Sequence, residues 1–194
     1  MNHNVLFLKK FLRHGTKIAS AVPSSRWLAA KTISNVDWKK TRVIVELGAG
    51  TGPITDMLAK HAEAGCKLII IERDTDFLRI LRGRFSAHSN IEVIGGNACS
   101  IQEILSAKGI QKVDHIISGL PTPSLSKEDQ RRLFAGVRAT LTPGGSFNQL
   151  TEIPLIYLGY YRRWFRDVKF IFEPRNIPPA GVYICKAPID PAKS

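Results

Sequence analysis

Runs of apolar residues, many of them β-branched, recur along the chain and predict the strands of a buried sheet. Such unbroken runs are typical of parallel strands covered by helices on both faces. Between some of them, residues 54–62 and 133–141 keep helical spacing, and Ser126 with Asp129 resembles a capping box. The pattern predicts an α/β fold with a mainly parallel, seven-stranded sheet. The runs are residues 43–45, 67–71, 91–94, 113–117, 146–150, 168–172 and 182–185.

The first predicted strand leads directly into a glycine-rich loop, since residues 43–52 read VIVELGAGTG. Pro53 follows in the first turn of a predicted helix, where proline is tolerated best. The three glycines allow backbone conformations that other residues avoid, and they let a ligand approach the main chain. The sequence therefore predicts a strand, a ligand-binding loop and a helix that is capped near Gly65. The loop residues expected to contact the ligand are Gly48, Ala49, Gly50, Thr51 and Gly52.

The pattern of this loop favours S-adenosylmethionine over a nicotinamide dinucleotide. A dinucleotide fold carries G-x-G-x-x-G, whereas here the third glycine comes one residue early and Pro53 takes its place. Glu46 lies just before the loop, where a carboxylate would repel a pyrophosphate and attract an ammonium or sulfonium ion. S-adenosylmethionine carries both cations and no phosphate. A dinucleotide loop and a purely structural loop are the alternatives.

Polar residues after the next three predicted strands extend this site. Glu72, followed by Arg73, lies about 20 residues beyond the loop, the distance expected of an acid that binds ribose hydroxyls. Asn97 and Ala98 follow the third strand, where the amide could bond the adenine edge, and Ser118 begins an S-G-L-P segment after the fourth. Carboxyl ends of parallel strands lie together, so one cofactor could contact all of them. A solvated strand end and a plain turn are the alternatives for the second and third strands.

Composition narrows the class of protein. The 194 residues, 44% of them apolar, suffice for one well-packed core. Three widely spaced cysteines without a C-x-x-C pair indicate neither a disulfide framework nor a zinc site, which suits a reducing cytoplasm. No metal site is expected. The sequence also lacks a Walker loop and a zincin helix.

Positive charge is concentrated at the beginning of the chain. The net charge is +12, and residues 1–40 contain eight lysines and arginines against Asp37 alone. Projected as a helix, residues 5–18 place large apolar side chains opposite the basic ones, which suits the surface of an anionic membrane. The apolar run is too short to span a bilayer. A helix packed on the protein's own core and an RNA-binding face are the alternatives.

Aromatic and basic residues alternate near residues 155–165, which include three tyrosines, a tryptophan and two arginines. This mixture is typical of a membrane interface, an RNA surface or a half-buried helix. A proline-rich loop at residues 175–181 joins the last two predicted strands and is expected to return toward the active face.

Taken together, these segments resemble the bacterial phospholipid N-methyltransferases over nearly the whole chain. The glycine loop is common to many methyltransferases, whereas SGLP at residues 118–121 and NIPPAGVY at residues 176–183 are far more specific; AVPSS at 21–25 and LTPGG at 141–145 add to the likeness. The resemblance implies a Rossmann-like class I methyltransferase fold with an antiparallel final strand and an N-terminal amphipathic lid helix. It also implies N-methylation of phosphatidylethanolamine toward phosphatidylcholine, with S-adenosylmethionine as cofactor.

The resemblance also implies an organisation and a location. Residues 1–35 would form the basic amphipathic helix and lid, and residues 36–194 the methyltransferase domain. The helix would bind an anionic membrane that holds the phospholipid substrate, at the cytoplasmic, inner face of the cell membrane. No obligatory protein partner and no nucleic acid are expected. Ornithine lipid or another aminolipid is the alternative substrate.

Four residues are expected to contact the lipid headgroup. Rings of Tyr157 and Tyr183 could hold an ammonium through cation–π attraction, and Arg175, beside Asn176, could pair with a phosphate. A role in the core or in a loop is the alternative for each of them.

The chief rival is the neighbouring family of rRNA adenine dimethyltransferases, which has a similar glycine loop. Its catalytic loop resembles N-L-P-Y, in which an amide accepts bonds from the adenine amine and an aromatic ring stacks on the flipped base. Here Ser118 replaces the asparagine and Thr122 stands at the place of the tyrosine. A membrane-binding module with an inactive site is a third reading, but intact Glu46 and Glu72 argue against it.

Overall fold

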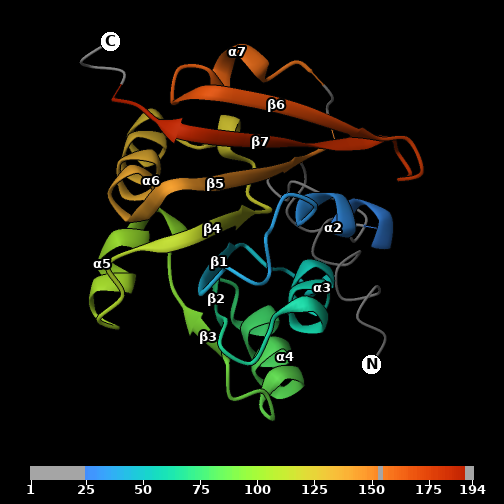
Figure 1. Cartoon of the computed structure of the whole chain (residues 1–194), viewed down its shortest axis with the longest axis vertical. Helices are drawn as coiled ribbons and strands as arrows, with labels where there is room; N and C mark the ends of the chain where they lie inside the picture. Colours follow the sequence, from blue (N-terminus) through green and yellow to red (C-terminus); the bar gives the residue numbers. More distant parts are fainter. Residues whose placement is uncertain (1–24, 153–154, 191–194) are drawn as a thin grey trace.

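The computed structural model describes residues 25–152 and 155–190, and this part of the chain forms one seven-stranded sheet with helices on both faces (Figure 1). The strand order is β3-β2-β1-β4-β5-β7-β6. Strands β1 to β5 pair in parallel, and β7 is antiparallel to both β5 and β6. The predicted Rossmann-like sheet with an antiparallel final strand is confirmed.

All seven predicted runs form strands. The largest difference is in β5, which begins at Leu141 and includes the expected turn of residues 142–145. The reason is a shift of register, because Val113 pairs with Leu141 while His115 pairs with Ser146. The strands are β1 (Val43–Leu47), β2 (Lys67–Glu72), β3 (Ile91–Gly95), β4 (Val113–Ser118), β5 (Leu141–Thr151), β6 (Phe165–Glu173) and β7 (Ala180–Pro188).

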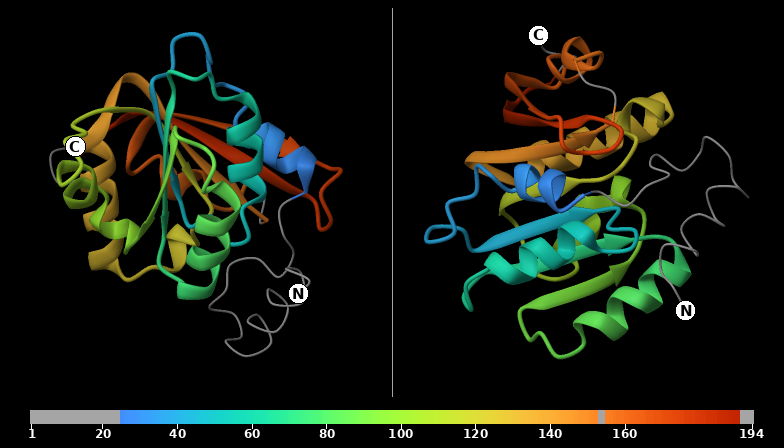
Figure 2. Two further views of the ribbon diagram at one scale, coloured as in Figure 1. Left: turned by 90° about the horizontal axis from the view of Figure 1, so that it is seen from below. Right: turned by 90° about the vertical axis from the view of Figure 1, so that its right-hand side faces the viewer.

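Helices α2 to α4 lie on one face of the sheet and α5 and α6 on the other (Figure 2). Ser126 is the N-cap of α6, as predicted: the amide of Asp129 donates to Ser126 Oγ at 3.0 Å, and Ser126 Oγ donates to Asp129 Oδ2 at 2.8 Å. The helix after the glycine loop ends at His61, short of Gly65, and only one turn forms within residues 155–165. The helices are α2 (Arg26–Thr32), α3 (Pro53–His61), α4 (Thr75–Phe85), α5 (Ile101–Ser106), α6 (Lys127–Thr140) and α7 (Leu158–Tyr161), with 3-10 turns η2 (Ala98–Ser100) and η3 (Thr122–Ser124).

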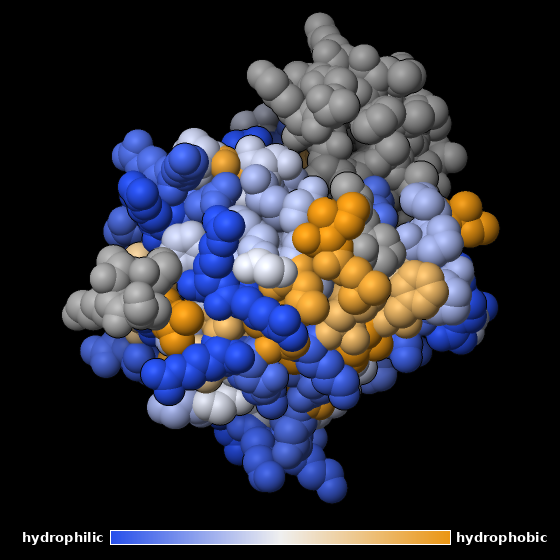
Figure 3. All heavy atoms as spheres, turned by 90° about the horizontal axis from the view of Figure 1, so that it is seen from above, coloured by the Kyte–Doolittle hydropathy of each residue, from blue (hydrophilic) through white to orange (hydrophobic). Residues whose placement is uncertain are grey.

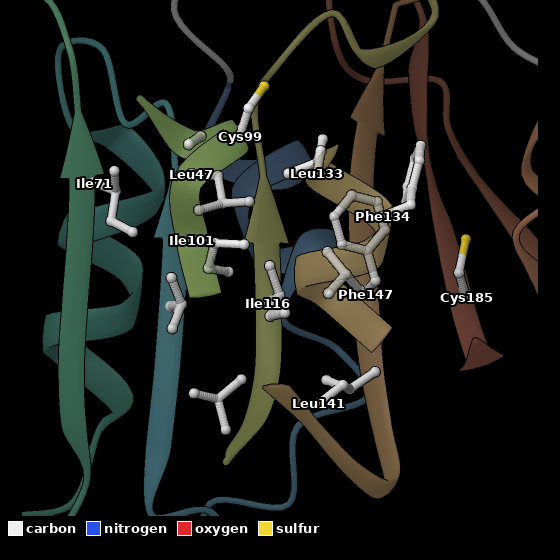
Figure 4. Packing of buried hydrophobic residues seen from close by; sticks show 14 of the residues in the cluster. Leu47, Ile71, Cys99, Ile101, Ile116, Leu133, Phe134, Leu141, Phe147 and Cys185 are labelled. Carbon is white, nitrogen blue, oxygen red and sulfur yellow. The ribbon is translucent and has the colours of Figure 1, made fainter. Parts of the chain in front are cut away.

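Two apolar layers hold the helices to the sheet. On the α5 and α6 side, Leu47 and Ile116 of the central strands pack with aromatic rings farther along the sheet (Figure 4). The rings of Phe134 on α6 and Phe147 on β5 meet edge to face, with centroids 5.7 Å apart. Burial of this kind contributes about 1.5–3 kcal/mol per large side chain, so the strand ends that carry the site rest on a rigid base.

Helix α2 belongs to the folded domain. Leu28 and Ala29 are buried against it, and Asn148 Nδ2 on β5 donates both to the carbonyl oxygen of Thr32 and to Asn35 Oδ1, each at 2.7 Å. Residues 25–35 thus help to build the core, and the expected boundary after residue 35 stays a prediction. The predicted lid helix at residues 5–18 lies outside the described residues. In the part of the chain that is described, no helix is long and apolar enough to cross a membrane.

Candidate active site

The loops after β1 and β4 meet at the carboxyl ends of the parallel strands. The amide of Gly119 donates to the carbonyl of Leu47 at 3.0 Å, and that of Gly48 donates to the carbonyl of Ile71 at 2.9 Å. A Cβ atom at Gly119 would lie 2.8 Å from the carbonyl oxygen of Gly48. The S-G-L-P loop can therefore approach the glycine loop this closely only with glycine at position 119.

The glycine loop presents its main chain to open space. Gly50 and Gly52 have φ angles of 57° and 89°, in the left-handed region that favours glycine. A Cβ atom at Gly50 would meet nothing within 4 Å, so a ligand can reach the backbone here. Neighbouring Ala49 and Thr51 are buried and hold the loop against the domain. Pro53 begins α3, as predicted.

Glu46 is buried at the end of β1 with half of its carboxylate unpaired. Its Oε2 accepts from Thr55 Oγ1 at 2.7 Å, whereas Oε1 has no partner among the described residues. Burial raises the pKa of Glu46 to about 8; the Thr55 bond opposes this, and the negative charges of Glu72 and Asp56 add to it. A buried, unpaired oxygen is costly. A cationic ligand donor would satisfy it, which fits S-adenosylmethionine.

Glu72 connects the glycine loop with the beginning of α4. Its Oε2 accepts from the amide of Gly50 at 2.9 Å, and its Oε1 accepts from the amides of Arg73 and Asp74, each at 2.9 Å. Each carboxylate oxygen has two lone pairs, so Oε2 keeps one for a hydroxyl donor. The carboxylate is therefore fixed in place and still able to accept a ligand bond, as the ribose prediction requires.

Asn97 caps η2 at the end of the third strand. Its Oδ1 accepts from the amide of Cys99 at 3.0 Å, while Ala98 is buried beneath it. The side chain of Asn97 is exposed, so its Nδ2 donor is the part that remains for a ligand. This geometry gives the residue a turn role and leaves the adenine contact as a prediction. Arg73, beside Glu72, is also exposed.

Gln149 on β5 supports the S-G-L-P loop through hydrogen bonds, and it was not among the predicted site residues. Its Nε2 donates to the carbonyl oxygens of Leu120 at 2.8 Å and Ser118 at 3.2 Å. Ser118 is itself fully buried, and its Oγ accepts from the amide of Leu120 at 3.3 Å. The available signal was a glutamine inside an apolar strand. In the sheet Gln149 is the partner of Ser118.

Thr122 completes this loop with a buried hydroxyl in the position that the rival family fills with a stacking ring. Its Oγ1 lies 2.7 Å from the hydroxyl of Tyr161, and its carbonyl accepts from the hydroxyl of Tyr160 at 3.1 Å. The two tyrosines thus fix the loop from α7. No aromatic ring of the S-G-L-P segment is available to stack on a base.

Two of the predicted headgroup residues lie together, but one of them is in the core. The amide of Tyr157 donates to the hydroxyl of Tyr183 at 3.2 Å. Tyr183 is fully buried, and its ring lies 4.8 Å from that of Tyr161 and 4.9 Å from that of Phe170, measured between centroids. Burial raises its pKa. The structure places Tyr183 in the core role named as its alternative, while Tyr157 is half-buried.

The other two predicted headgroup residues organise the β6–β7 hairpin. Arg175 donates from Nε and Nη2 to the two carboxylate oxygens of buried Glu173, at 2.7 and 2.8 Å, and this pairing lowers the pKa of Glu173 to about 2. Asn176 Oδ1 accepts from the amide of Ser25 at 3.2 Å, and its Nδ2 donates to the carbonyl of Pro178 at 2.7 Å. Both side chains therefore have structural partners already.

A stack of cations on an indole joins this hairpin to α2. The guanidinium of Arg175 lies 4.1 Å from the centroid of Trp27, and that of Arg26 lies 4.5 Å from the same ring. Arg26 has no carboxylate partner among residues 25–152 and 155–190. Trp27 and Arg26 were not among the predicted site residues. The contact between Trp27 and Arg175 joins positions about 150 apart in the chain, so no local pattern indicates it.

A doubly wound sheet with a glycine loop, a buried acid before it and a fixed acid after β2 defines a class I S-adenosylmethionine-dependent methyltransferase. Comparison with known proteins agrees. The methyltransferase domain family matches residues 44–145. The ornithine lipid N-methyltransferase of Singulisphaera acidiphila is 51% identical over 181 residues, which cover 93% of this chain and 94% of that protein. The chain belongs to the family of that enzyme, the S-adenosylmethionine-dependent N-methyltransferases.

More distant proteins share the fold or part of the sequence. Aeropyrum pernix fibrillarin, solved with natively bound S-adenosylmethionine, has a TM-score of 0.60 at 16% identity and covers 81% of this chain and 72% of its own. The probable ribosomal RNA small subunit methyltransferase A of Methanosarcina barkeri is 38% identical over 86 residues, 44% of this chain and 26% of that protein. The likeness to the RNA enzymes is therefore partial.

Proposed function

We propose that this protein transfers a methyl group from S-adenosylmethionine to the amine of a membrane aminolipid, and that ornithine lipid is its substrate. The observation that carries the proposal is the 51% identity, over 93% of the chain, to an enzyme named for ornithine lipid. It favours the alternative aminolipid over phosphatidylethanolamine. Both lipids present a cationic amine near an anionic group, so the general form of the site suits either.

The cofactor is held by the strand ends described above. Glu46 would accept a hydrogen bond from the cationic amino group of the cofactor through its unpaired Oε1, and Glu72 would accept one from a ribose hydroxyl through Oε2. The open main chain at Gly50 allows the ligand to approach closely. Asn97 offers Nδ2 to the adenine. When bound, the cofactor supplies an electrophilic methyl group.

The S-G-L-P loop orients the amine. The lipid ammonium loses one proton to water before the transfer, because only a neutral amine has a free lone pair. A carbonyl oxygen accepts two hydrogen bonds, and the Leu120 carbonyl already accepts from Gln149 Nε2 at 2.8 Å and from the amide of Thr122 at 2.9 Å, so it fixes the shape of the loop around the amine. Most of the acceleration in such a transfer comes from positioning and exclusion of water. The rigid support from Gln149 and Thr122 serves this purpose.

The proposal includes peripheral binding to the anionic inner face of the cell membrane through the basic N-terminal helix. Its support is the sequence pattern of residues 5–18 and the net charge of +12. Apolar side chains opposite lysines and arginines are suited to the headgroup region.

The proposal is tested by transfer of radiolabelled methyl from S-adenosylmethionine to vesicles that contain ornithine lipid, phosphatidylethanolamine or neither, with ribosomal RNA in parallel. Chromatography separates the methylated products. We expect label in ornithine lipid, and the number of labelled products shows how many methyl groups are added. Label only in phosphatidylethanolamine would overturn the substrate, and label only in RNA would overturn the lipid reading altogether.

A further inference from the structure

Five large apolar side chains are exposed in the described part of the chain, and all of them lie at the end of the sheet that carries the active site. Their exposed fractions range from 38% to 83%. Two follow β5, one is near the end of β6, one is in the β6–β7 hairpin and one begins α2. We call this set the apolar rim: Trp27, Leu155, Ile156, Phe172 and Ile177.

The topology explains why these positions come together. Strands β4 and β5 both point to the right in Figure 1, where α2 and the β6–β7 hairpin also lie. The hairpin is tied to the start of α2 by the bond from the Ser25 amide to Asn176 and by the stack of Arg175 on Trp27. The segment after β5 is tied to β7 by the bond from the Tyr157 amide to Tyr183. The rim therefore has a fixed place beside the cofactor loops.

Basic side chains accompany the rim. Asp167 is the one acid among residues 155–172, which contain four arginines and lysines. The acid at the hairpin, Glu173, is buried and paired with Arg175. Figure 3 shows hydrophobic residues gathered on part of the face above β6, with hydrophilic ones around them. The exposed cationic side chains beside the rim are Arg26 and Arg175, which both stack on Trp27. Arg162, Arg163, Arg166 and Lys169 are also exposed, but they lie before β6 or farther back along it.

RNA, a second copy of the chain and a lipid bilayer are the partners to compare, and the chemistry of this surface favours the bilayer. Exposed aliphatic chains such as Leu155, Ile156 and Ile177 give no stacking platform for the bases of RNA. A second copy pairing along edge strand β6 would meet Arg166 and Lys169, and charges of this kind oppose pairing between edge strands. Aliphatic and tryptophan side chains among arginines instead match the boundary between headgroups and acyl chains of an anionic membrane.

We propose that the apolar rim inserts into the surface of an anionic bilayer, as a membrane contact of the folded domain that does not depend on residues 1–24. The inference rests on the proposed function in one respect, namely that the acceptor is a lipid. Insertion at this end directs the cofactor loops toward the membrane. A lipid headgroup could then reach the S-G-L-P loop while its acyl chains remain in the bilayer.

The test is vesicle flotation of the full-length chain with the double variant Ile156→Glu/Ile177→Glu. The vesicles contain phosphatidylglycerol and phosphatidylcholine but no aminolipid, so binding is measured without catalysis. The matched control is Ala87→Glu/Ser89→Glu, which adds the same charge at exposed positions after α4, at the opposite end of the sheet. We expect the rim variant to bind about ten-fold more weakly or worse, and the control to bind like the parent.

Three results would overturn the inference. They are unchanged binding by the rim variant, an equal loss in the control, and a dimer in the absence of vesicles that the rim variant dissociates. Unchanged affinity for S-adenosylmethionine in both variants verifies that they are folded. If the parent binds vesicles through the rim but transfers no methyl group to any aminolipid, the proposed function fails and the membrane contact remains.

Discussion

Glu46 is a fully buried acid whose ionisation destabilises the fold. Its pKa is raised from 4.5 to about 8, chiefly by burial. Between these two values the unfolded chain has released the proton while the folded chain keeps it. The protonated Glu46 carboxyl group therefore contributes its full stabilisation of the fold below pH 4.5, and this contribution is lost as the pH rises toward 8. The negative charge of Glu46, which would attract the cofactor, thus lowers the stability of the folded chain when no cofactor is bound.

The variant Glu46→Gln tests this cost, because glutamine has a similar shape and does not ionise. Without cofactor, we expect its free energy of unfolding, relative to the parent, to increase by about 4 kcal/mol between pH 5 and pH 9. Urea unfolding at the two pH values measures this difference. Parallel pH profiles would show that the carboxyl is not buried as described. Affinity for S-adenosylmethionine should fall in the same variant, since the buried anion is lost.

Glu72 should be essential for the cofactor and dispensable for the membrane. Glu72→Ala removes the acceptor of three backbone amides and the proposed ribose contact. Hydrogen bonds to charged groups contribute about 1.5–3 kcal/mol each, so the Kd for S-adenosylmethionine should rise at least about 10-fold. Calorimetric titration measures it, with exposed Glu63→Ala as the control. Vesicle binding should not change, and a parallel loss of it would indicate general unfolding.

Among the elements, β5 supports the S-G-L-P loop directly, through Gln149. Gln149→Ala removes the donor to the carbonyls of Ser118 and Leu120. Small displacements of positioning groups lower rates by about 10- to 100-fold, so kcat should fall by this factor while affinity for S-adenosylmethionine changes little. Steady-state kinetics and calorimetry separate the two effects. Gln102→Ala, at an exposed position on α5, is the control. Equal losses in both parameters would assign Gln149 a merely structural role.

The elements could be predicted because their signals are local. Apolar runs mark all seven strands, and Pro53 and Ser126 mark the beginnings of two helices. The role of Gln149 could not be predicted, because it depends on the register shift that pairs this residue with Ser118. The burial of Tyr183 likewise depends on packing against α7, far away in the sequence. The proposed cofactor residues follow single strands, so their common location at the strand ends could be predicted, whereas the locations of the proposed headgroup residues depend on long-range contacts.

At the scale of the whole molecule, two surfaces are proposed to meet the membrane: the basic segment at residues 5–18 and the apolar rim. Two linked contacts bind far more tightly than either one alone, because the first holds the second at a high effective concentration. Deleting residues 1–18 should therefore greatly weaken vesicle binding while leaving affinity for S-adenosylmethionine intact. Flotation beside calorimetry measures both, and equal vesicle binding after the deletion would contradict the anchoring role.

The basic segment and the apolar rim contact the membrane independently only if the factors by which their loss weakens vesicle binding multiply. When two contacts share no partners, their contributions to the free energy of binding add, so the corresponding factors in affinity multiply. The rim variant Ile156→Glu/Ile177→Glu should thus weaken vesicle binding by the same factor, about ten-fold, in the full-length chain and in the chain lacking residues 1–18. If the rim variant has no effect after the deletion, the rim does not bind lipid by itself. In that case the N-terminal segment alone would bring the active site to the bilayer.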